Sequence, residues 1–329
     1  MSKVVRFHRV GGPEVLQFDE VDVPAPQADE IQIDVKALGV NRAEIMFRTG
    51  QYVIEPEFPA KLGYEAAGDI IAVGSGVSGF AAGDRVSVIP AFSFADYGMY
   101  GEVVNVPARA VVKVPDGVTY EEAAATWMMF TTAYGALINM GGLGEGDAVL
   151  LGAATSSIGL ASIQVANMVK ATPIALTNSP AKLDSLRAAG APHAFLANAP
   201  DLVERVMEIT DGKGARIAFD PVGGPGARSL MQALSYEGIF YQYGALDARD
   251  LTVPVMDMLS KHLTVRGYEL FEITKDDRRI EEAKEFITRG LSTKALRPAI
   301  DRVFTFDQIG DAHSYMEAGN QVGKIIVSV

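Results

Sequence analysis

The stretch that decides the fold is DAVLLGAATSSIG, at residues 147–159. A short apolar strand precedes a turn of small residues, and a helical pattern begins near Ser157. Such a turn lets backbone N–H groups and the positive end of the helix dipole approach a pyrophosphate. The three small positions hold Ala153, Ser156 and Gly159 in place of the usual three glycines. The turn therefore indicates a dinucleotide site, although close packing of helix on strand would also explain it.

Strand and helix patterns alternate along the chain after this turn. Strand-like segments lie at 172–178, 193–199, 215–222, 238–246 and 263–270, with helical segments such as 181–190 and 201–212 between them. This alternation is typical of parallel strands joined by right-handed helical crossovers. We therefore expect an α/β domain with a doubly wound parallel sheet.

The residues before the turn have a different pattern. Short segments rich in β-branched residues, separated by glycine and proline, lie at 4–10, 16–23, 30–40, 68–74, 84–90 and 110–115. They predict an antiparallel, barrel-like domain. A helical pattern follows at 120–140. The last part combines a charged helix at 276–290, expected to have a solvated face, with closing strands near 297–304 and 324–329.

The end of the strand-like segment at 172–178 is relevant to the choice of cofactor. This end contains Thr177 and Asn178, Ser179 follows, and Lys182 opens the next helix. Proteins of this fold that prefer NAD place a carboxylate there for the ribose 2′-hydroxyl, but here the only carboxylate from Asp147 to Lys182 is Asp147 itself. The 2′-phosphate of NADP carries roughly −2 charge and suits hydroxyl groups and a cation. The pattern favours NADP(H), while a helix N-cap followed by a surface lysine is the structural alternative.

Composition limits the possible partners. The chain has 329 residues, enough for two domains of roughly 100–200 residues each. It carries 29 Lys and Arg against 41 Asp and Glu, a net charge of −12. This sign argues against nucleic acid and against an anionic membrane surface, because both repel negative charge. The absence of cysteine excludes disulfides, thiolate nucleophiles and zinc sites built on sulfur.

Two uncharged runs, 123–144 and 148–169, are long enough to cross a membrane. Both contain polar residues and glycines, which favour buried elements of an α/β core over membrane spans. The N-terminus, MSKVVRFHRVGGPEV, lacks the apolar region of a secretory signal. We therefore expect a cytoplasmic protein that does not associate with membranes.

Several short motifs occur together in a characteristic order. They are GGPEVL at 11–16, GVNRAE at 39–44, GYEAAGDIIAVG at 63–74, GDRV at 83–86, TTAYGAL at 131–137, AATSSIG at 153–159, AGAPHAF at 189–195, DPVGG at 220–224 and GKIIV at 323–327. With these motifs the sequence resembles the medium-chain dehydrogenase/reductase superfamily, and most of all its zinc-independent quinone oxidoreductase branch. The resemblance implies a GroES-like, β-rich catalytic domain made from residues 1–123 and 267–329. It also implies an inserted Rossmann domain with a doubly wound parallel sheet at 124–266.

The sequence differs from the zinc alcohol dehydrogenases of that superfamily at positions where those enzymes have metal ligands. Those enzymes have a cysteine where this chain has Asn41, and a histidine–glutamate pair where it has Tyr64 and Glu65. A catalytic zinc needs three protein ligands. The histidines of this chain lie in no matching motif; they are His8, His193, His262 and His313. The resemblance therefore implies that the protein holds no metal.

Loss of the metal changes which reaction is plausible. Reduction of a simple ketone builds negative charge on one oxygen, which a Lewis acid or a strong proton donor normally stabilises. Quinones and α,β-unsaturated carbonyl compounds spread that charge. We therefore expect an NADPH-dependent quinone or enone oxidoreductase acting on a small molecule. The alternatives are a zinc-free alcohol or aldehyde reductase, and a low-turnover NADPH-binding protein with a regulatory or structural role.

The resemblance also implies four catalytic candidates. Asn41 would direct its amide toward the substrate carbonyl or the nicotinamide ribose, or it caps a turn. Tyr52, in RTGQY, would donate a hydrogen bond to the developing oxyanion. Tyr64 would fill the space of the missing metal, with packing as the alternative. Thr132 would lie beside the nicotinamide ring, or bond a carbonyl inside its own helix.

The expected cofactor site covers several segments. Its candidates are Ala153, Ser156, Ser157, Ile158 and Gly159 at the turn; Thr177, Asn178, Ser179 and Lys182 at the ribose; Gly244 and Ala245 beside the nicotinamide; and Asn320 and Lys324 at the phosphates. The superfamily commonly pairs Rossmann domains edge to edge, and the apolar strands near 238–268 are suited to this. We therefore expect a homodimer with C₂ symmetry.

Overall fold

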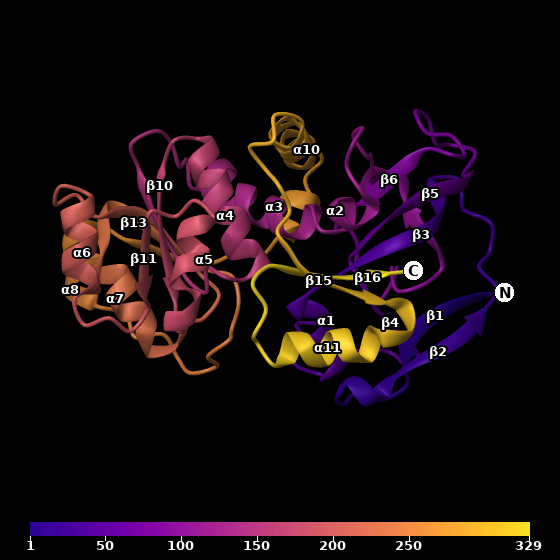
Figure 1. The fold of residues 1–329 in the computed structure, drawn as a ribbon, viewed down its shortest axis with the longest axis horizontal. Helices are drawn as coiled ribbons and strands as arrows, with labels where there is room; N and C mark the ends of the chain where they lie inside the picture. Colours follow the sequence, from indigo (N-terminus) through magenta and orange to yellow (C-terminus); the bar gives the residue numbers. More distant parts are fainter. The chain divides into compact units, whose positions relative to one another are not determined.

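The computed structural model describes all residues, 1–329, as two compact units. The first comprises Met1–Met128 and Pro298–Val329, and the second comprises Met129–Arg297. Both ends of the chain therefore build the first unit, and Figure 1 shows the yellow C-terminal strand β16 beside the indigo strand β3.

The boundaries of the units differ from those expected. The chain enters the second unit after Met128 rather than after residue 123, and it returns at Pro298 rather than at residue 267. Residues 267–297 thus belong to the second unit. The reason is the packing of α10 (Asp277–Ser292), whose charged sequence conceals a buried face: the Phe286 ring lies 5.0 Å from that of Tyr134.

The first unit contains two sheets. The smaller has the order β2 (Leu16–Val21), β1 (Ser2–Phe7), β4 (Ala60–Lys61). The larger has the order β15 (Ile300–Thr305), β16 (Lys324–Ser328), β3 (Glu30–Val40), β5 (Glu65–Val73), β6 (Arg85–Val88), β8 (Val111–Lys113), with β7 (Val103–Pro107) also paired to β3. Every pairing is antiparallel except that of β15 with β16. Because Ile325 pairs with Val40 and Gly39 with Glu65, the ends of three strands meet at one place.

Short helices complete this unit. They are η1 (Pro13–Val15), α1 (Arg42–Arg48), η2 (Ala108–Ala110), α2 (Tyr120–Ala124), η6 (Phe306–Gln308) and α11 (Ile309–Glu317). The helix expected at 120–140 is divided into α2, α3 (Trp127–Tyr134) and the π-helix η3 (Gly135–Met140). The chain passes from the first unit to the second within α3.

The second unit contains the expected parallel sheet. Its strands are β9 (Ala148–Leu151), β10 (Thr172–Thr177), β11 (His193–Leu196), β12 (Ala215–Asp220), β13 (Leu234–Gln242) and β14 (Thr264–Gly267). All pairings are parallel, in the order β11-β10-β9-β12-β13-β14. The order reverses at β9, and a sheet of this kind binds ligands where the strand order reverses, at the carboxyl ends.

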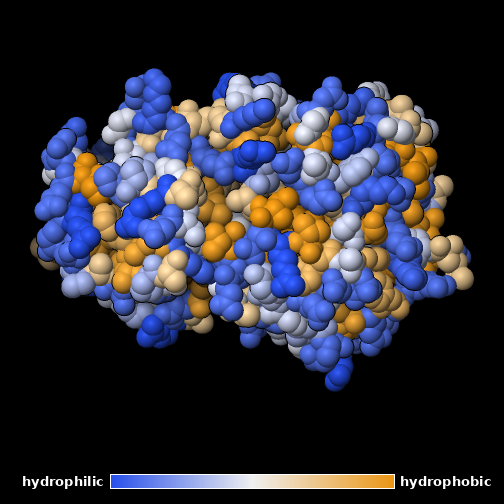
Figure 2. All heavy atoms as spheres, viewed as in Figure 1, coloured by the Kyte–Doolittle hydropathy of each residue, from blue (hydrophilic) through white to orange (hydrophobic).

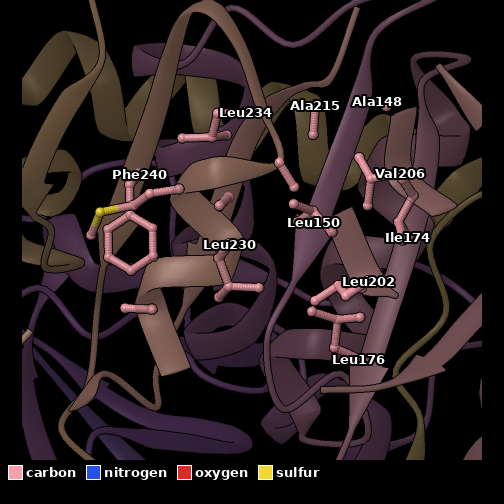
Figure 3. Close-up of a cluster of buried hydrophobic side chains, with 14 residues drawn as sticks. Ala148, Leu150, Ile174, Leu176, Leu202, Val206, Ala215, Leu230, Leu234 and Phe240 are labelled. Carbon is pink, nitrogen blue, oxygen red and sulfur yellow. The ribbon is translucent and has the colours of Figure 1, made fainter. Parts of the chain in front are cut away.

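Helices connect these strands. They are α4 (Ser157–Met168), η4 (Pro180–Lys182), α5 (Leu183–Ala188), α6 (Leu202–Ile209), η5 (Gly224–Gly226), α7 (Ala227–Gln232), α8 (Val255–Lys261), α9 (Phe271–Thr274) and α10. Figure 3 shows the core between sheet and helices, where Leu150 of β9 and Leu176 of β10 lie among side chains such as Leu202 and Val206 of α6. All four are buried, so the apolar strands are stabilised by helix packing.

Neither uncharged run forms a membrane-spanning helix. Residues 123–144 cover the end of α2 with α3 and η3, and residues 148–169 cover β9 and α4. None of the helices is both long and apolar enough to span a bilayer. Figure 2 shows hydrophilic residues, in blue, over much of the visible surface.

Candidate active site

The turn after β9 leaves no room for side chains at two positions. A Cβ at Gly152 would overlap the carboxylate of Asp220, at the end of β12. A Cβ at Gly159 would lie 2.5 Å from the Cα of Ala154. Between them Ala153 has φ +43°, a left-handed conformation that is uncommon for residues other than glycine. The conformation of this turn therefore requires small residues at these positions.

The turn leads directly into α4. The Ser156 hydroxyl accepts a hydrogen bond from the Gly159 N–H, at 3.1 Å, and so caps the helix. Ser157 and Ile158 are the first two residues of α4, whose N–H groups have no partner within the helix. This arrangement can hold an anionic group at the end of the helix.

The end of β10 lies beside the turn. The Ala154 N–H donates to the Leu176 carbonyl at 2.9 Å, which joins the two segments. Thr177 is buried, and its hydroxyl accepts from the Ser179 N–H at 3.2 Å. Ser179 precedes η4, but its side chain does not cap that helix. Ser179 thus occupies the N-cap position of η4, but its hydroxyl makes no capping hydrogen bond.

The end of β13 lies at the same edge of the sheet. A Cβ at Gly244 would lie 2.9 Å from the Pro221 carbonyl oxygen, so this position also requires a small residue. Ala245 follows and is exposed. The Tyr243 N–H donates to the Asp220 carbonyl at 3.0 Å. Ala153, Ser156 and Thr177, together with Gly244, are thus brought together at the carboxyl ends of neighbouring strands.

Asp220 is a polar residue of this edge that sequence reasoning did not single out. Its carboxylate is buried and accepts from the Gly223 N–H at 2.8 Å, and burial raises its pKa. Tyr243 was also missed; its ring stacks on Phe219 at 3.9 Å, and its phenol bonds the Ser156 side chain. The motif DPVGG at 220–224 contains Asp220 and could have drawn attention to it. The motif does not show, however, which neighbouring strand the Asp220 side chain lies against.

Asn41 lies at the junction of β3 and α1 in the first unit. Its backbone N–H donates to the Glu44 carboxylate, and its Nδ2 donates to Glu44 Oε1 at 3.0 Å. The Tyr64 N–H donates to the same oxygen at 3.2 Å. Glu44 is fully buried, and burial raises its pKa to about 8. A neutral carboxyl group at this position is therefore stable at neutral pH.

An ion pair lies on the other side of Asn41. The Lys324 ammonium donates to Glu65 Oε2, and it donates to Asn41 Oδ1 at 2.5 Å. The other oxygen of Glu65 accepts from the Met128 N–H at 2.7 Å. Lys324 and Glu65 are each only 1% exposed. Lys324, which we expected on the cofactor phosphates, thus points into the first unit, while Asn320 is exposed on the loop before β16.

The two tyrosine candidates lie together in the first unit. The hydroxyl oxygens of Tyr52 and Tyr64 are 3.5 Å apart. The Tyr64 ring is stacked on Phe94 at 3.8 Å, and Phe94 is stacked on Phe47 at 4.8 Å. Tyr64 is buried, whereas the side chain of Tyr52 is partly exposed to solvent. Thr132 belongs to the second unit and is buried within α3.

The acidic and histidine side chains form no metal centre. No group of three or more His, Cys, Asp or Glu residues lies close enough to hold a metal ion. Among the histidines, His313 is buried against the Tyr100 hydroxyl, at 3.1 Å, and burial lowers its pKa to about 3. His8 lies beside Asp19 on the surface.

Comparison with known proteins places this geometry in a family. Residues 27–116 match the model of the alcohol dehydrogenase GroES-like domain, and residues 157–289 match that of the zinc-binding dehydrogenase. Quinone oxidoreductase 1 of Escherichia coli is 34% identical over 244 residues, which cover 74% of this chain and 73% of that protein. The chain belongs to the medium-chain dehydrogenase/reductase superfamily.

Within this superfamily the chain lies in the quinone oxidoreductase branch and is an oxidoreductase. The human synaptic vesicle membrane protein VAT-1 homolog is 30% identical over 331 residues, covering 95% of this chain and 82% of that protein. The crystal structure of Escherichia coli quinone oxidoreductase complexed with NADPH has a TM-score of 0.88 and 28% identity, covering 99% and 100% of the two chains. The expected GroES-like and Rossmann architecture of a medium-chain dehydrogenase/reductase is thereby confirmed.

Proposed function

We propose that this protein is an NADPH-dependent reductase that transfers hydride to a quinone or an α,β-unsaturated carbonyl compound without a metal ion. The observation that carries the proposal is the Lys324 ammonium, 2.5 Å from the side-chain oxygen of Asn41. Asn41 stands where the zinc alcohol dehydrogenases of the superfamily have a metal ligand. A divalent cation beside a fixed ammonium is disfavoured by charge repulsion. The donor set at this position therefore does not fit a metal.

The substrate class follows from the groups that can stabilise negative charge. Tyr52 offers a phenol hydrogen bond to a substrate oxygen, and Tyr64 lies behind it as a second hydroxyl. Hydrogen bonds alone suit a substrate whose own conjugation spreads the charge that hydride addition creates. Quinones and enones have this property, and simple ketones do not.

The cofactor proposal rests on the edge of the parallel sheet. Small residues at Gly152, Ala153 and Gly159 keep side chains off the turn, and α4 offers free N–H groups to a pyrophosphate. Ser179 and Lys182, with Thr177 and Asn178, would hold the 2′-phosphate. When bound, NADPH supplies the hydride. The complex of the Escherichia coli relative with NADPH supports this choice.

The remaining candidates have roles beside the nicotinamide. We assign Thr132, Gly244 and Ala245 to the nicotinamide end of the cofactor, because a small residue at Gly244 keeps the backbone open. The Asn41 amide is hydrogen-bonded to Lys324 through its oxygen and to Glu44 through its nitrogen. We therefore assign Asn41 to the wall of the site rather than to a hydrogen bond with the substrate. A small carbonyl compound is the only partner that this chemistry requires.

A second function, binding of NADPH with little turnover, is favoured by one comparison. The human relative with 30% identity is named as a synaptic vesicle membrane protein. A zinc-free alcohol or aldehyde reductase is the other enzymatic candidate.

The test is NADPH oxidation with a benzoquinone, an enone and a simple ketone, with and without a chelator. We expect turnover of the first two only, unchanged by the chelator. Tyr52→Phe should lower kcat roughly 10²-fold while NADPH binding stays the same, since the phenol acts on the transition state. Tyr315→Phe, which removes a hydroxyl bonded to Asp301 on the surface, is the control.

Other results would contradict the proposal. Preferential turnover of the ketone would favour an alcohol or aldehyde reductase, and tight NADPH binding without turnover of any substrate would favour a binding protein. Stoichiometric zinc, lost together with activity in the chelator, would show that the site uses a metal.

A further inference from the structure

Lys324 is the only cation in a buried cluster that otherwise holds two carboxyl groups and an amide. Its ammonium lies between Glu65 and Asn41, and Glu44 lies on the far side of Asn41. Removing a charge from water is costly unless it is paired and hydrogen-bonded. The Lys324–Glu65 pair meets this condition, and a neutral Glu44, favoured by its raised pKa, leaves the cluster without net charge.

The ammonium determines how the Asn41 amide is turned. An ammonium group only donates hydrogen bonds, so Asn41 must present its oxygen to Lys324. The amide nitrogen then faces the other way, toward Glu44 Oε1 at 3.0 Å and the Gly39 carbonyl at 3.3 Å. Lys324 thereby fixes the orientation of the N-cap residue that precedes α1.

The same ammonium holds Glu65 at the start of α3. Glu65 Oε1 accepts from the N–H of Met128, the second residue of that helix, at 2.7 Å. A carboxylate at a helix N-terminus satisfies free N–H groups and interacts favourably with the helix dipole. Because α3 carries Thr132, an ionised Glu65 also fixes the start of a helix that we assign to the nicotinamide end of the site.

The packing leaves little freedom for another position of the lysine. A Cβ at Gly39 would lie 2.9 Å from Lys324 Cε, so this glycine makes room for the lysine stem. To reach a cofactor phosphate, the Lys324 ammonium would have to move away from Glu65. The Glu65 side chain, which is only 1% exposed, would then be an unpaired buried carboxylate. That exchange is unfavourable.

We propose that Lys324 is a positioning residue, the internal counter-ion that keeps Glu65 ionised and orients Asn41, and that it is not a ligand of the cofactor phosphates. It acts on the reaction through α1 and α3. Its effect on turnover rests on the proposed function, but its effect on stability and on cofactor binding does not.

The test is a double-mutant cycle of Lys324→Met, Glu65→Gln and the two combined. We measure the thermal midpoint, the Kd for NADPH and, with a benzoquinone, the dependence of kcat on pH. Lys324→Met should lower the midpoint by roughly 5 °C or more and kcat by about tenfold, while the Kd for NADPH changes less than about threefold. The combined variant, which has no buried charge to pair, should recover most of the lost stability.

The pH profile separates positioning from simple destabilisation. In Lys324→Met the buried carboxyl of Glu65 has lost the cation that keeps it ionised, and the ionised form is the one that holds the start of α3. The kcat of this variant should therefore rise with pH more than that of the wild type, and this dependence should vanish in the combined variant. Lys182→Ala, at the expected 2′-phosphate, is the matched control that should weaken NADPH binding. If Lys324→Met and the combined variant both weaken NADPH binding tenfold or more, Lys324 is a phosphate ligand and the proposal is wrong.

Two further outcomes keep the test decisive. If Lys324→Met does not fold, Glu65→Gln alone should lower the thermal midpoint with an unchanged Kd for NADPH; tighter NADPH binding without loss of stability would overturn the proposal. If no quinone or enone is reduced, the function proposed above fails. The cycle in thermal midpoint and Kd still decides the role of Lys324, since neither needs turnover.

Discussion

Glu44 is a fully buried carboxyl group that faces three N–H donors, two of Asn41 and one of Tyr64. Burial raises its pKa to about 8, against the opposing influence of Asn41 and Lys324. In the unfolded chain the group ionises near its ordinary pKa, so the unfolded state binds fewer protons between that pH and about 8. The free energy of unfolding should therefore fall as the pH rises through this window.

Glu44→Gln tests this prediction, because the variant has no group to titrate. The loss of stability between about pH 5 and about pH 8 should be smaller than in the wild type when unfolding is followed in urea. Glu285→Gln, an exposed carboxylate on α10, is the control and should leave the slope unchanged. Equal slopes in wild type and Glu44→Gln would mean that Glu44 is ionised in the folded protein throughout.

Cofactor choice is a second prediction at the scale of single residues. Lys182→Ala should weaken NADPH binding about tenfold to a hundredfold and NADH binding much less, because only NADPH carries the 2′-phosphate. Ser179→Asp should go further, since it adds a charge that repels the phosphate and an acceptor for a free hydroxyl. Both cofactors would be titrated at constant ionic strength, because salt screens surface charges. A wild type that prefers NADH, or equal losses for both cofactors, would refute the assignment.

At the scale of elements, the contact between α4 and the turn after β9 depends on Gly159. A Cβ there would meet the Ala154 backbone, which cannot move aside as a flexible side chain would. Gly159→Ala should displace the start of α4, cost about 1–3 kcal/mol of stability and weaken NADPH binding at least about tenfold. Gly226→Ala is the control, since a Cβ at Gly226 meets no atom within 4 Å. Unchanged NADPH binding in Gly159→Ala would place the cofactor elsewhere.

At the scale of the whole molecule, one edge of the parallel sheet has features of an interface. Strand β14 is the last strand of the sheet, and α8 exposes Val255, Met256 and Leu259 nearby in the second unit. An unpaired edge with exposed apolar groups favours pairing with a second copy. We predict a C₂ dimer, which light scattering at micromolar concentration should report as twice the chain mass of 35.1 kDa.

The substitution Met256→Glu combined with Leu259→Glu should shift the dimer toward monomer, because it buries charge in the interface. Val53→Glu, at an equally exposed apolar residue of the first unit, should leave the mass unchanged. A wild type that is monomeric at this concentration would rule out the dimer.

Short-range patterns in the sequence predicted most of the fold. Alternating strand and helix after residue 147 predicted the parallel sheet, since the apolar periodicity of a segment depends only on its own residues. The small residues of 153–159 likewise predicted a turn of the observed kind. The helix at 120–140 was predicted as one element, but it changes at Ala125 and again at Gly135, because the helical periodicity of a sequence does not distinguish an α-helix from a π-helix.

Contacts between residues far apart in the chain were decided only by the tertiary structure. The sequence gives no sign that Lys324 lies on Glu65, 259 residues earlier, or that Asp220 closes the space beside Gly152. The charges of α10 indicated a solvated helix, yet its apolar face packs within the second unit and moves the boundary to Arg297. Such contacts depend on strand order and register, which arise only when the whole sheet forms. The residue types of the candidate site are therefore set by the sequence, whereas which of them pair is decided by the fold.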